Sequence, residues 1–226
     1  MKVLIYTSSF DRPKMLRSCI QDAQSQTYND ILHVINLTAG STNQIPVIND
    51  LFNGKTHIVM YPNGHSHVNN MNAIMSVHNY MDFDLFVKFD DDDIHKKDYV
   101  QNIVNHFEQH PECDVVSTCI KHQLNGNVVL NASPNQFGGW VICNDVYDNL
   151  TGNPEGTDYH MPMTFAFNKK ALLSIMNLTN LWHFDDVLWR EKWAKDGIIH
   201  QTVHNEDQVI WYVHANNISM SHLLKT

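Results

Sequence analysis

The sequence predicts an α/β fold in which a mostly parallel central sheet is flanked by helices. In the first half of the chain, short apolar runs typical of strands alternate with longer segments whose apolar residues recur at helical spacing. Such an alternation favours a parallel sheet covered by helices. No internal repeat, low-complexity tract or Pro/Gly-rich linker divides the 226 residues, so we expect one domain, 1–226.

Strands are expected where apolar runs are short and rich in β-branched or aromatic residues. The first such run is "KVLIY", and the fourth, "DLFVKF", leads directly into an acidic run. The expected strands cover residues 2–6, 31–37, 56–61, 84–89 and 114–120.

Helices are expected between these strands. Pro13 suits the first turn of a helix, and the residues after it place an apolar face at helical spacing: Met15, Leu16, Cys19, Ile20 and Ala23. The segment "KKDYVQNIVNHFEQH" is amphipathic in the same way. The expected helices cover residues 13–26, 44–52, 68–81 and 96–110.

The second half of the chain is less regular and is rich in aromatic and polar residues. We expect loops, short strands and two helices there, in the stretches 135–145, 154–172 and 181–197. A regular half followed by an irregular one predicts that residues 1–115 bind a cofactor or donor and that residues 116–226 bind an acceptor.

Composition and charge narrow the function classes. The chain is 43% hydrophobic and 17% charged, as soluble globular proteins are. Its net charge of -9 argues against a broad nucleic-acid-binding face. The apolar start of "MKVLIYTSSFDRP" is too short for a signal peptide or a membrane span, so we expect a cytoplasmic protein without a transmembrane segment. The cysteines lack CxxC spacing and are expected to be reduced thiols: Cys19, Cys113, Cys119 and Cys143.

The most informative stretch is "FVKFDDDDIHKKDYV", in which four aspartates follow a strand. Adjacent carboxylates repel one another, and partial burial raises their pKa values, so a bound cation or full exposure must compensate. Ligands of parallel sheets bind beyond the carboxyl ends of the strands, and Mg²⁺ and Mn²⁺ prefer carboxylate oxygens. The run therefore predicts a metal site, and the alternative is a solvated turn that caps the next helix.

Two stretches of the chain resemble family 2 glycosyltransferases. "VLIYTSSFDRPKMLRSCIQDAQSQTY" is similar to the family's opening strand, Thr-Tyr-Asn-Arg-Pro turn and helix, and the aspartate run is similar to its metal-binding DxD region. Between them, "YPNGHSHVNNMNAIMS" resembles the segment that carries an Arg-Asn in the family. The resemblance covers residues 3–110 well, and the order and spacing of the motifs make it fairly specific.

The resemblance implies a single-domain GT-A fold with a Rossmann-like sheet, a nucleotide-diphosphate sugar as donor, and Mn²⁺ or Mg²⁺ as cofactor. Asp90 would face the ribose and Asp92 the metal, with Asp91 and Asp93 as candidates if the register shifts by one. The residues implied in nucleotide-sugar binding are Thr7, Ser8, Phe10, Arg12, Thr38, Asn72, Asp90 and Asp91. Asn70 is an alternative to Asn72.

One departure from the family concerns the base of the nucleotide. After the second strand the family has Asp-Asp-Gly-Ser, whose acid contacts the base, whereas this chain has "NLTAGST". Thr38 can still hydrogen-bond a base edge, but the identity of the base is left open.

An inverting transfer needs a base that takes the proton from the acceptor hydroxyl. By position in the family, "HFDDVLWREKW" supplies Asp185 and Asp186 as the catalytic pair, with Asp186 as the general base. The alternative for this pair is helix capping, and the acidic pair Glu206 and Asp207 is a competitor on a later strand.

Histidine and tryptophan residues supply the remaining candidates. His214 resembles the family's late histidine, which can complete the metal site, and His222 is its alternative. Trp140 is expected to offer a face to the acceptor, with plain packing as the alternative, whereas Trp189 and Trp193 are expected in the core. His106 and His110 have the spacing of zinc ligands on a helix, but no third ligand is indicated, so we expect a solvated face: "YVQNIVNHFEQH".

The sequence thus predicts a metal-dependent, inverting glycosyltransferase with a peripheral or soluble location. A glycan or lipid-linked glycan is the expected acceptor, and the net charge of -9 disfavours a nucleic-acid acceptor. Two other classes stay open: a nucleotidyltransferase or other metal-dependent phosphoryl-transfer enzyme, and a non-catalytic sugar-nucleotide binder. The missing Gly-rich phosphate loop counts against P-loop enzymes.

Overall fold

A computed structural model gives the fold of the chain. It describes residues 1–38, 42–61, 74–118, 120–124, 127–134, 140–142, 165–176, 178, 189, 192–203 and 209–213.

The main sheet has seven strands in the order β11-β6-β10-β4-β1-β2-β3. Its strands are β1 (Val3–Ser9), β2 (Ile31–Thr38), β3 (Thr56–Tyr61), β4 (Leu85–Lys88), β6 (Val115–Thr118), β10 (Ala166–Asn168) and β11 (His200–Val203). The first four run parallel to one another, and β11 runs parallel to β6. Only β10 is antiparallel to its neighbours within this sheet. The predicted α/β fold with a mostly parallel sheet is therefore confirmed.

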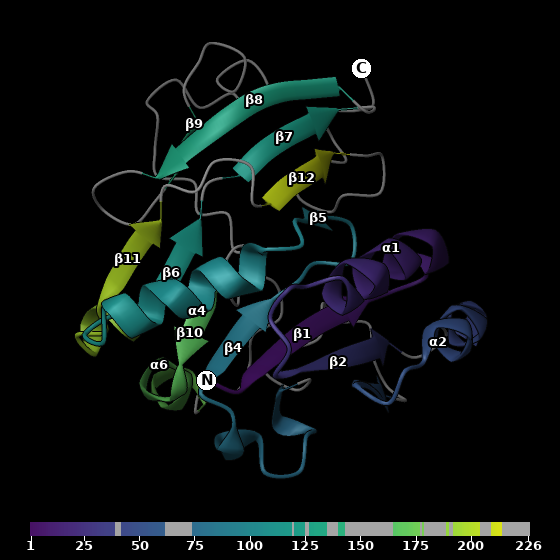
Figure 1. Cartoon of the computed structure of the whole chain (residues 1–226), viewed down its shortest axis with the longest axis horizontal. Coiled ribbons are helices and arrows are strands. Elements are labelled where there is room, and N and C mark those ends of the chain that lie inside the picture. The colour runs from purple at the N-terminus through teal and green to yellow at the C-terminus, as the bar shows by residue number, and fades with distance from the viewer. Residues whose placement is uncertain are drawn as a thin grey trace.

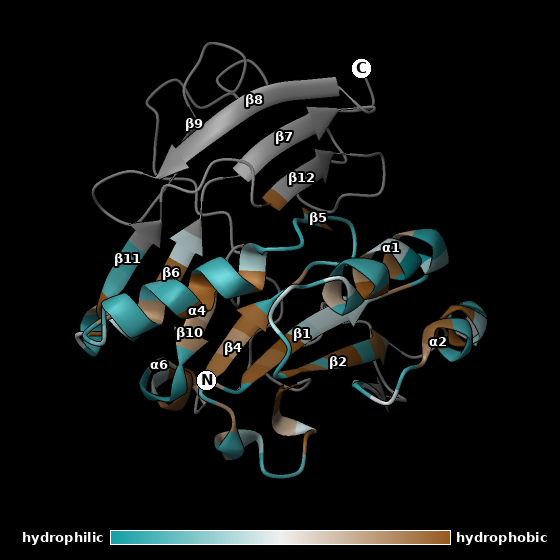
Figure 2. Cartoon of the chain, viewed as in Figure 1, coloured by the Kyte–Doolittle hydropathy of each residue, from teal (hydrophilic) through white to brown (hydrophobic). Residues whose placement is uncertain are grey.

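Helices cover both faces of this sheet (Figure 1). The helices α1 (Pro13–Gln24) and α4 (Tyr99–Gln109) pack on one face, and α6 (Lys169–Ile175) packs on the other. The short helix α2 (Ile45–Leu51) follows the single turn η1 (Thr42–Gln44) and packs beside α1. In Figure 2 the strands β2 and β4 are mostly brown (hydrophobic), the carboxyl end of β1 is pale, and the outer surfaces of α1 and α4 are mostly teal (hydrophilic).

Alternating side chains of β1 divide the core between the two faces. Val3 and Ile5 join the apolar cluster under α1 and α4, whereas Leu4 and Tyr6 join the cluster on the α6 side. Both faces of the strand are buried, which explains its continuous apolar run. As predicted, Trp189 and Trp193 lie in the core, where they are 1% and 2% exposed.

A second sheet of five strands, in the order β5-β12-β7-β8-β9, packs beyond the main sheet. Its strands are β5 (Ile94–His95), β7 (Ile120–Leu124), β8 (Asn127–Pro134), β9 (Trp140–Ile142) and β12 (Val209–Val213). The carboxyl ends of β4 and β6 point toward it (Figure 1). Because β5 directly follows the aspartate run and pairs with β12, that run connects the two sheets.

The prediction of a helix over residues 68–81 is wrong at the carboxyl end of that segment. Residues 68–81 were expected to form a continuous helix, but only Ile74 and Met75 are helical in the described part, which continues as turns and the single 3-10 turn η2 (Tyr80–Asp82). Asn79 has a φ of 59°, which lies in the left-handed region and cannot continue a right-handed helix.

Within the described residues, no helix is long and apolar enough to cross a membrane. Cys19 and Cys113 are buried free thiols, as predicted, while Cys119 and Cys143 lie outside the described side chains.

Candidate functional site

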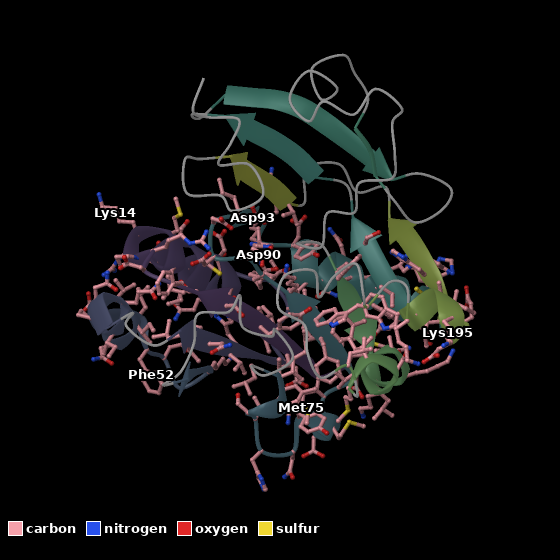
Figure 3. All side chains as sticks on the ribbon, turned by 180° about the vertical axis from the view of Figure 1, so that it is seen from behind. Lys14, Phe52, Met75, Asp90, Asp93 and Lys195 are labelled. Atoms are coloured by element: carbon pink, nitrogen blue, oxygen red, sulfur yellow. The ribbon has the colours of Figure 1, made fainter. Side chains whose placement is uncertain are left out.

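The four aspartates alternate in exposure along the loop that follows β4. The side chains of Asp90 and Asp92 are 26% and 14% exposed. Asp91 and Asp93 are each only 2% exposed. Figure 3 shows Asp90 and Asp93 in the region between the two sheets. Asp90 and Asp92 are therefore the carboxylates most open to a ligand, and Asp91 faces the interior of the protein.

Two cations offset part of the charge of these carboxylates. The Nη1 atom of Arg12 lies 3.3 Å from Oδ1 of Asp91 and also contacts Oδ2 of Asp92. The Nζ atom of Lys88, at the end of β4, lies 3.0 Å from Oδ2 of Asp90. The sequence analysis predicted that something must compensate the charge of adjacent carboxylates. In the described structure this compensation comes from ion pairs with Lys88 on β4 and Arg12 in the β1–α1 turn.

The pKa values show how crowded the carboxylates are. Burial raises the pKa of Asp91 to about 7, although the charge of Arg12 and the hydrogen bond from Ser9 act in the opposite direction. Burial also raises the pKa of Asp90, against the charge of Lys88. Burial alone would lower the pKa of Arg12, but Asp91 and Asp92 outweigh it and raise that pKa. Carboxylates held in this way are more typical of a binding site than of a solvated turn.

The β1–α1 turn brings Arg12 to the aspartates. Asp11 has a φ of 53°, a left-handed conformation that a short polar side chain tolerates, and its Oδ1 accepts a hydrogen bond from Nδ2 of Asn43. Phe10, just before it, is 52% exposed. Pro13 then begins α1 with a φ that suits a first turn.

The serines of β1 have different surroundings from Thr7. Ser8 is half-buried at the carboxyl end of the strand, and Ser9 is buried and donates to Oδ2 of Asp91. The Thr7 hydroxyl points into the core, where it lies 2.9 Å from Nε2 of His33 and 3.5 Å from Sγ of Cys19. The structure thus brings Ser9 and Arg12 into contact with the aspartate loop, places Ser8 at the same end of β1, and turns the Thr7 side chain into the core.

Several predicted site residues cannot be compared with the geometry. Thr38 ends β2 and Trp140 begins β9, but their side chains lie outside the described part of the structure. The other candidates lie outside the described residues altogether: Asn70, Asn72, Asp185, Asp186, Glu206, Asp207, His214 and His222. The aspartate register, the general base and the late metal ligand therefore stay predictions.

The structure adds residues that sequence reasoning missed. Lys88 stands inside an apolar strand, and this isolated charge was the signal that could have revealed its role. Gln44 is fully buried, and its Nε2 donates to Oγ of Ser9 over 2.5 Å. Asn36 is 1% exposed in β2, and among the residues that the structure describes neither its amide nitrogen nor its oxygen has a hydrogen-bond partner. Nothing in the sequence pattern places Gln44 against Ser9.

The described residues fit a divalent cation in part. Asp92 offers a carboxylate that is 14% exposed, and carboxylate oxygens are the donors that Mn²⁺ and Mg²⁺ prefer. Among the side chains described, no three of His, Cys, Asp and Glu converge on one position, so a complete ligand set needs a group from elsewhere in the chain or from the donor. His106 and His110 contact other groups: Nε2 of His106 lies 2.8 Å from Oε1 of Gln201, and Nδ1 of His110 lies 3.4 Å from Oε1 of Glu112.

The sequence profile of the family described as "Glycosyl transferase family 2" matches residues 4–173. The chain belongs to this family. The matched part contains the β1–α1 turn, the aspartate run and the main sheet as far as β10, which are the elements that form the site described above. A comparison with curated proteins found no match.

Solved structures similar to the chain are glycosyltransferases with a GT-A fold. The structure of S. aureus TarS 1–349 in complex with UDP-GlcNAc has a TM-score of 0.67 at 12% identity, over 100% of this chain and 61% of that one. The mannosyltransferase PcManGT from Pyrobaculum calidifontis in complex with GDP-Man and Mn²⁺ has a TM-score of 0.62 at 14% identity, over 98% and 59%. A longer TarS structure has a TM-score of 0.63 at 13% identity, over 95% and 37%.

The chain spans between 37% and 61% of the length of these structures. At these identities the likeness establishes the fold, which is GT-A, in agreement with the prediction.

Proposed function

We propose that this protein is a metal-dependent, inverting glycosyltransferase that moves a sugar from a nucleotide-diphosphate sugar to an acceptor hydroxyl. The observation that carries the proposal is the grouping of Arg12, Asp90 and Asp92 at the carboxyl ends of β1 and β4 in a chain of this family. Residues 1–115 bind the donor and residues 116–226 bind the acceptor.

The donor lies across the carboxyl ends of β1, β2 and β4. The exposed ring of Phe10 offers a face on which a base can stack, beside Ser8. To Thr38 we assign a hydrogen bond to the base edge, and to Asn72 a contact with the sugar nucleotide. In support of a nucleotide-sugar donor, the TarS structures hold UDP and UDP-GlcNAc, and the mannosyltransferase holds GDP-Man.

Charges at the site suit a diphosphate. Arg12 is a rigid, permanently charged group with several donors, which matches phosphate oxygens. Asp90 would accept a hydrogen bond from a ribose hydroxyl, and Asp92, with His214 as a further ligand, would hold Mn²⁺ or Mg²⁺. When bound, such a metal neutralises the charge that develops on the departing diphosphate. The presence of Mn²⁺ in the mannosyltransferase structure supports a divalent metal.

The acceptor half supplies the base. The Asp186 carboxylate takes the proton from the acceptor hydroxyl as its oxygen forms a bond to the anomeric carbon. The bond from that carbon to the diphosphate oxygen breaks on the opposite side, so the anomeric configuration inverts. Asp185 orients the chain segment that carries Asp186. Trp140 offers an apolar face to the acceptor. A glycan or lipid-linked glycan is the acceptor that we propose.

The first experiment is a donor assay with UDP-sugars and GDP-mannose, in Mn²⁺ or in EDTA. Release of nucleoside diphosphate that requires the metal and is lost in Asp92→Asn supports the transferase and argues against a sugar-nucleotide binder. Release of sugar 1-phosphate instead identifies a nucleotidyltransferase, because the nucleoside monophosphate is then the group transferred and the bond between the two phosphates is the one that breaks. NMR of the transferred sugar then establishes whether the anomeric configuration inverts.

Adjacent aspartates provide a matched control for the base. We expect Asp186→Asn to lower kcat at least about a hundredfold because general-base catalysis contributes factors of that order. Asp185→Asn changes the neighbouring charge equally but should lower kcat far less. An equal loss of kcat in the two variants would contradict the assignment of Asp186 as the general base.

A further inference from the structure

A continuous set of hydrogen bonds connects the η1 turn to the aspartate loop. Nε2 of Gln44 donates to Oγ of Ser9 over 2.5 Å, and the Ser9 hydroxyl donates in turn to Oδ2 of Asp91. The other oxygen of Asp91 lies 3.3 Å from Nη1 of Arg12. Gln44, Ser9 and Asp91 are each at most 2% exposed, so water does not compete for these bonds.

The direction of these bonds fixes how Asp91 can act. Because Ser9 accepts from Gln44, its single proton is directed to Asp91. Asp91 therefore receives Ser9 on one oxygen and Arg12 on the other. A carboxylate held on both sides in this way cannot turn toward the ligand, and its role is to hold the guanidinium.

Arg12 has a second partner of a different kind. Asp92, which it also contacts, is 14% exposed, compared with 2% for Asp91. A divalent cation on Asp92 would repel the guanidinium and compete for the same carboxylate. Arg12 would then lose Asp92 but keep Asp91, and its free donors would point into the site that the metal shares with the diphosphate.

We propose that Gln44 and Ser9 are positioning residues of the donor site. By fixing the Asp91 carboxylate they hold Arg12 in place, so that its guanidinium exchanges Asp92 for the donor diphosphate when Asp92 takes up a divalent cation. This inference rests on the proposed function, because it requires a nucleoside diphosphate and a metal at this site.

The exchange couples the two ligands. The diphosphate gains Arg12 only after Asp92 is occupied by the metal, and the metal gains Asp92 more easily when the diphosphate takes Arg12. Each ligand therefore raises the affinity for the other by the same factor. A loosened Asp91 would lower this factor, because Arg12 would no longer be held where the diphosphate arrives.

The test is isothermal titration of the full chain with UDP, GDP, CDP, ADP and dTDP, with and without Mn²⁺, followed by Mn²⁺ with and without the diphosphate that binds. For the wild type we expect Mn²⁺ to tighten diphosphate binding. In Ser9→Ala we expect the Kd of the diphosphate in Mn²⁺ to rise about tenfold, the usual worth of a hydrogen bond to a charged group. In Gln44→Met we expect a smaller rise of the same Kd, because the bond that is lost there is to the neutral Ser9 hydroxyl. Ser9→Thr retains the hydroxyl and should restore the wild-type Kd.

Two further variants serve as matched controls. Ser174 donates to Oδ2 of Asp196 on the exposed surface, and Gln24 donates to the carbonyl of Leu51, so Ser174→Ala and Gln24→Met remove bonds of the same kinds elsewhere. Both should leave the coupling between Mn²⁺ and diphosphate unchanged. Thermal unfolding of every variant shows that loss of binding is not loss of fold.

A double-mutant cycle separates positioning from packing. If Gln44 acts through Ser9, then Gln44→Met should change the coupling little once Ser9 is alanine. Wild-type coupling in both single variants, or fully additive losses, would overturn the inference. A wild type that binds no diphosphate in Mn²⁺ would instead overturn the proposed donor site, so the failures of the two proposals are distinguishable.

Discussion

The buried imidazole of His33 makes the stability of this protein sensitive to mild acid. Its side chain is 3% exposed, and burial lowers its pKa from the ordinary 6.5 to about 3. Below the ordinary value the unfolded chain binds a proton that the folded chain excludes, so stability falls as the pH drops from 6.5 toward 3. We expect this residue alone to lower the free energy of unfolding by about 2 kcal/mol between about pH 7.5 and about pH 5.

The measurement is urea denaturation of the wild type and of His33→Gln over this pH range. Gln can still hydrogen-bond the Thr7 hydroxyl, which lies 2.9 Å from Nε2 of His33. Unlike an imidazole, however, its amide does not take up a proton over this pH range. The variant should lose stability at neutral pH and decline less steeply in acid. An equal decline in the two proteins would mean that other groups account for the acid sensitivity.

Residues of the site differ in how far the sequence reveals them. Phe10, Arg12 and the aspartate run stand in motifs with fixed spacing, so their grouping at one edge of the sheet was predictable. Ser9 and Gln44 were not, because a hydroxyl and an amide occur throughout the chain and only packing brings these two within 2.5 Å. The alternation of exposure among the aspartates likewise depends on the turn that the loop adopts.

Elements were predictable where local pattern decides the structure. The strand expected at 56–61 is β3, and the helix expected at 96–110 contains α4, because apolar periodicity dominates both segments. The antiparallel strand β10 was not predictable, since its pairing between β4 and β6 involves partners distant in sequence. Pairing of this kind is decided by tertiary contacts rather than by propensity.

The element that departs most from prediction provides a test of its own. Asn79 lies just before the η2 turn and has a φ of 59°. Because its side chain is exposed, its replacement changes the backbone preference with little change in packing. We expect Asn79→Val to lower the free energy of unfolding by about 1 to 2 kcal/mol because a β-branched residue resists this conformation. Asn79→Gly should be nearly neutral. Urea denaturation measures both changes.

The neighbouring position gives the control. His78 is exposed and has no positive φ, so His78→Val makes a similar change of side chain without the backbone conflict. A cost for His78→Val equal to that for Asn79→Val would show that the left-handed conformation does not matter.

At the scale of the whole molecule, the aspartate run joins the two sheets. It leaves the carboxyl end of β4 in the main sheet and enters β5, which pairs with β12 in the second sheet. Its carboxylates are crowded, and burial raises the pKa values of Asp90 and Asp91. The ligand-free protein thus holds unfavourable charge at the junction of its sheets, as binding sites often do at a cost in stability.

Ligands at this junction should therefore stabilise the molecule as a unit. We expect Mn²⁺ together with a bound nucleoside diphosphate, each at about a hundred times its Kd, to raise the Tm by about 10 to 20 °C in one transition. Asp92→Asn should abolish the part of the Tm increase that depends on metal. Asp30→Asn, which changes an exposed acid just before β2, should keep that part. Differential scanning calorimetry, repeated in EDTA, makes the measurement. If Mn²⁺ raised the Tm equally in wild type and Asp92→Asn, the cation would bind elsewhere on this acidic chain, and the aspartate run would not be its site.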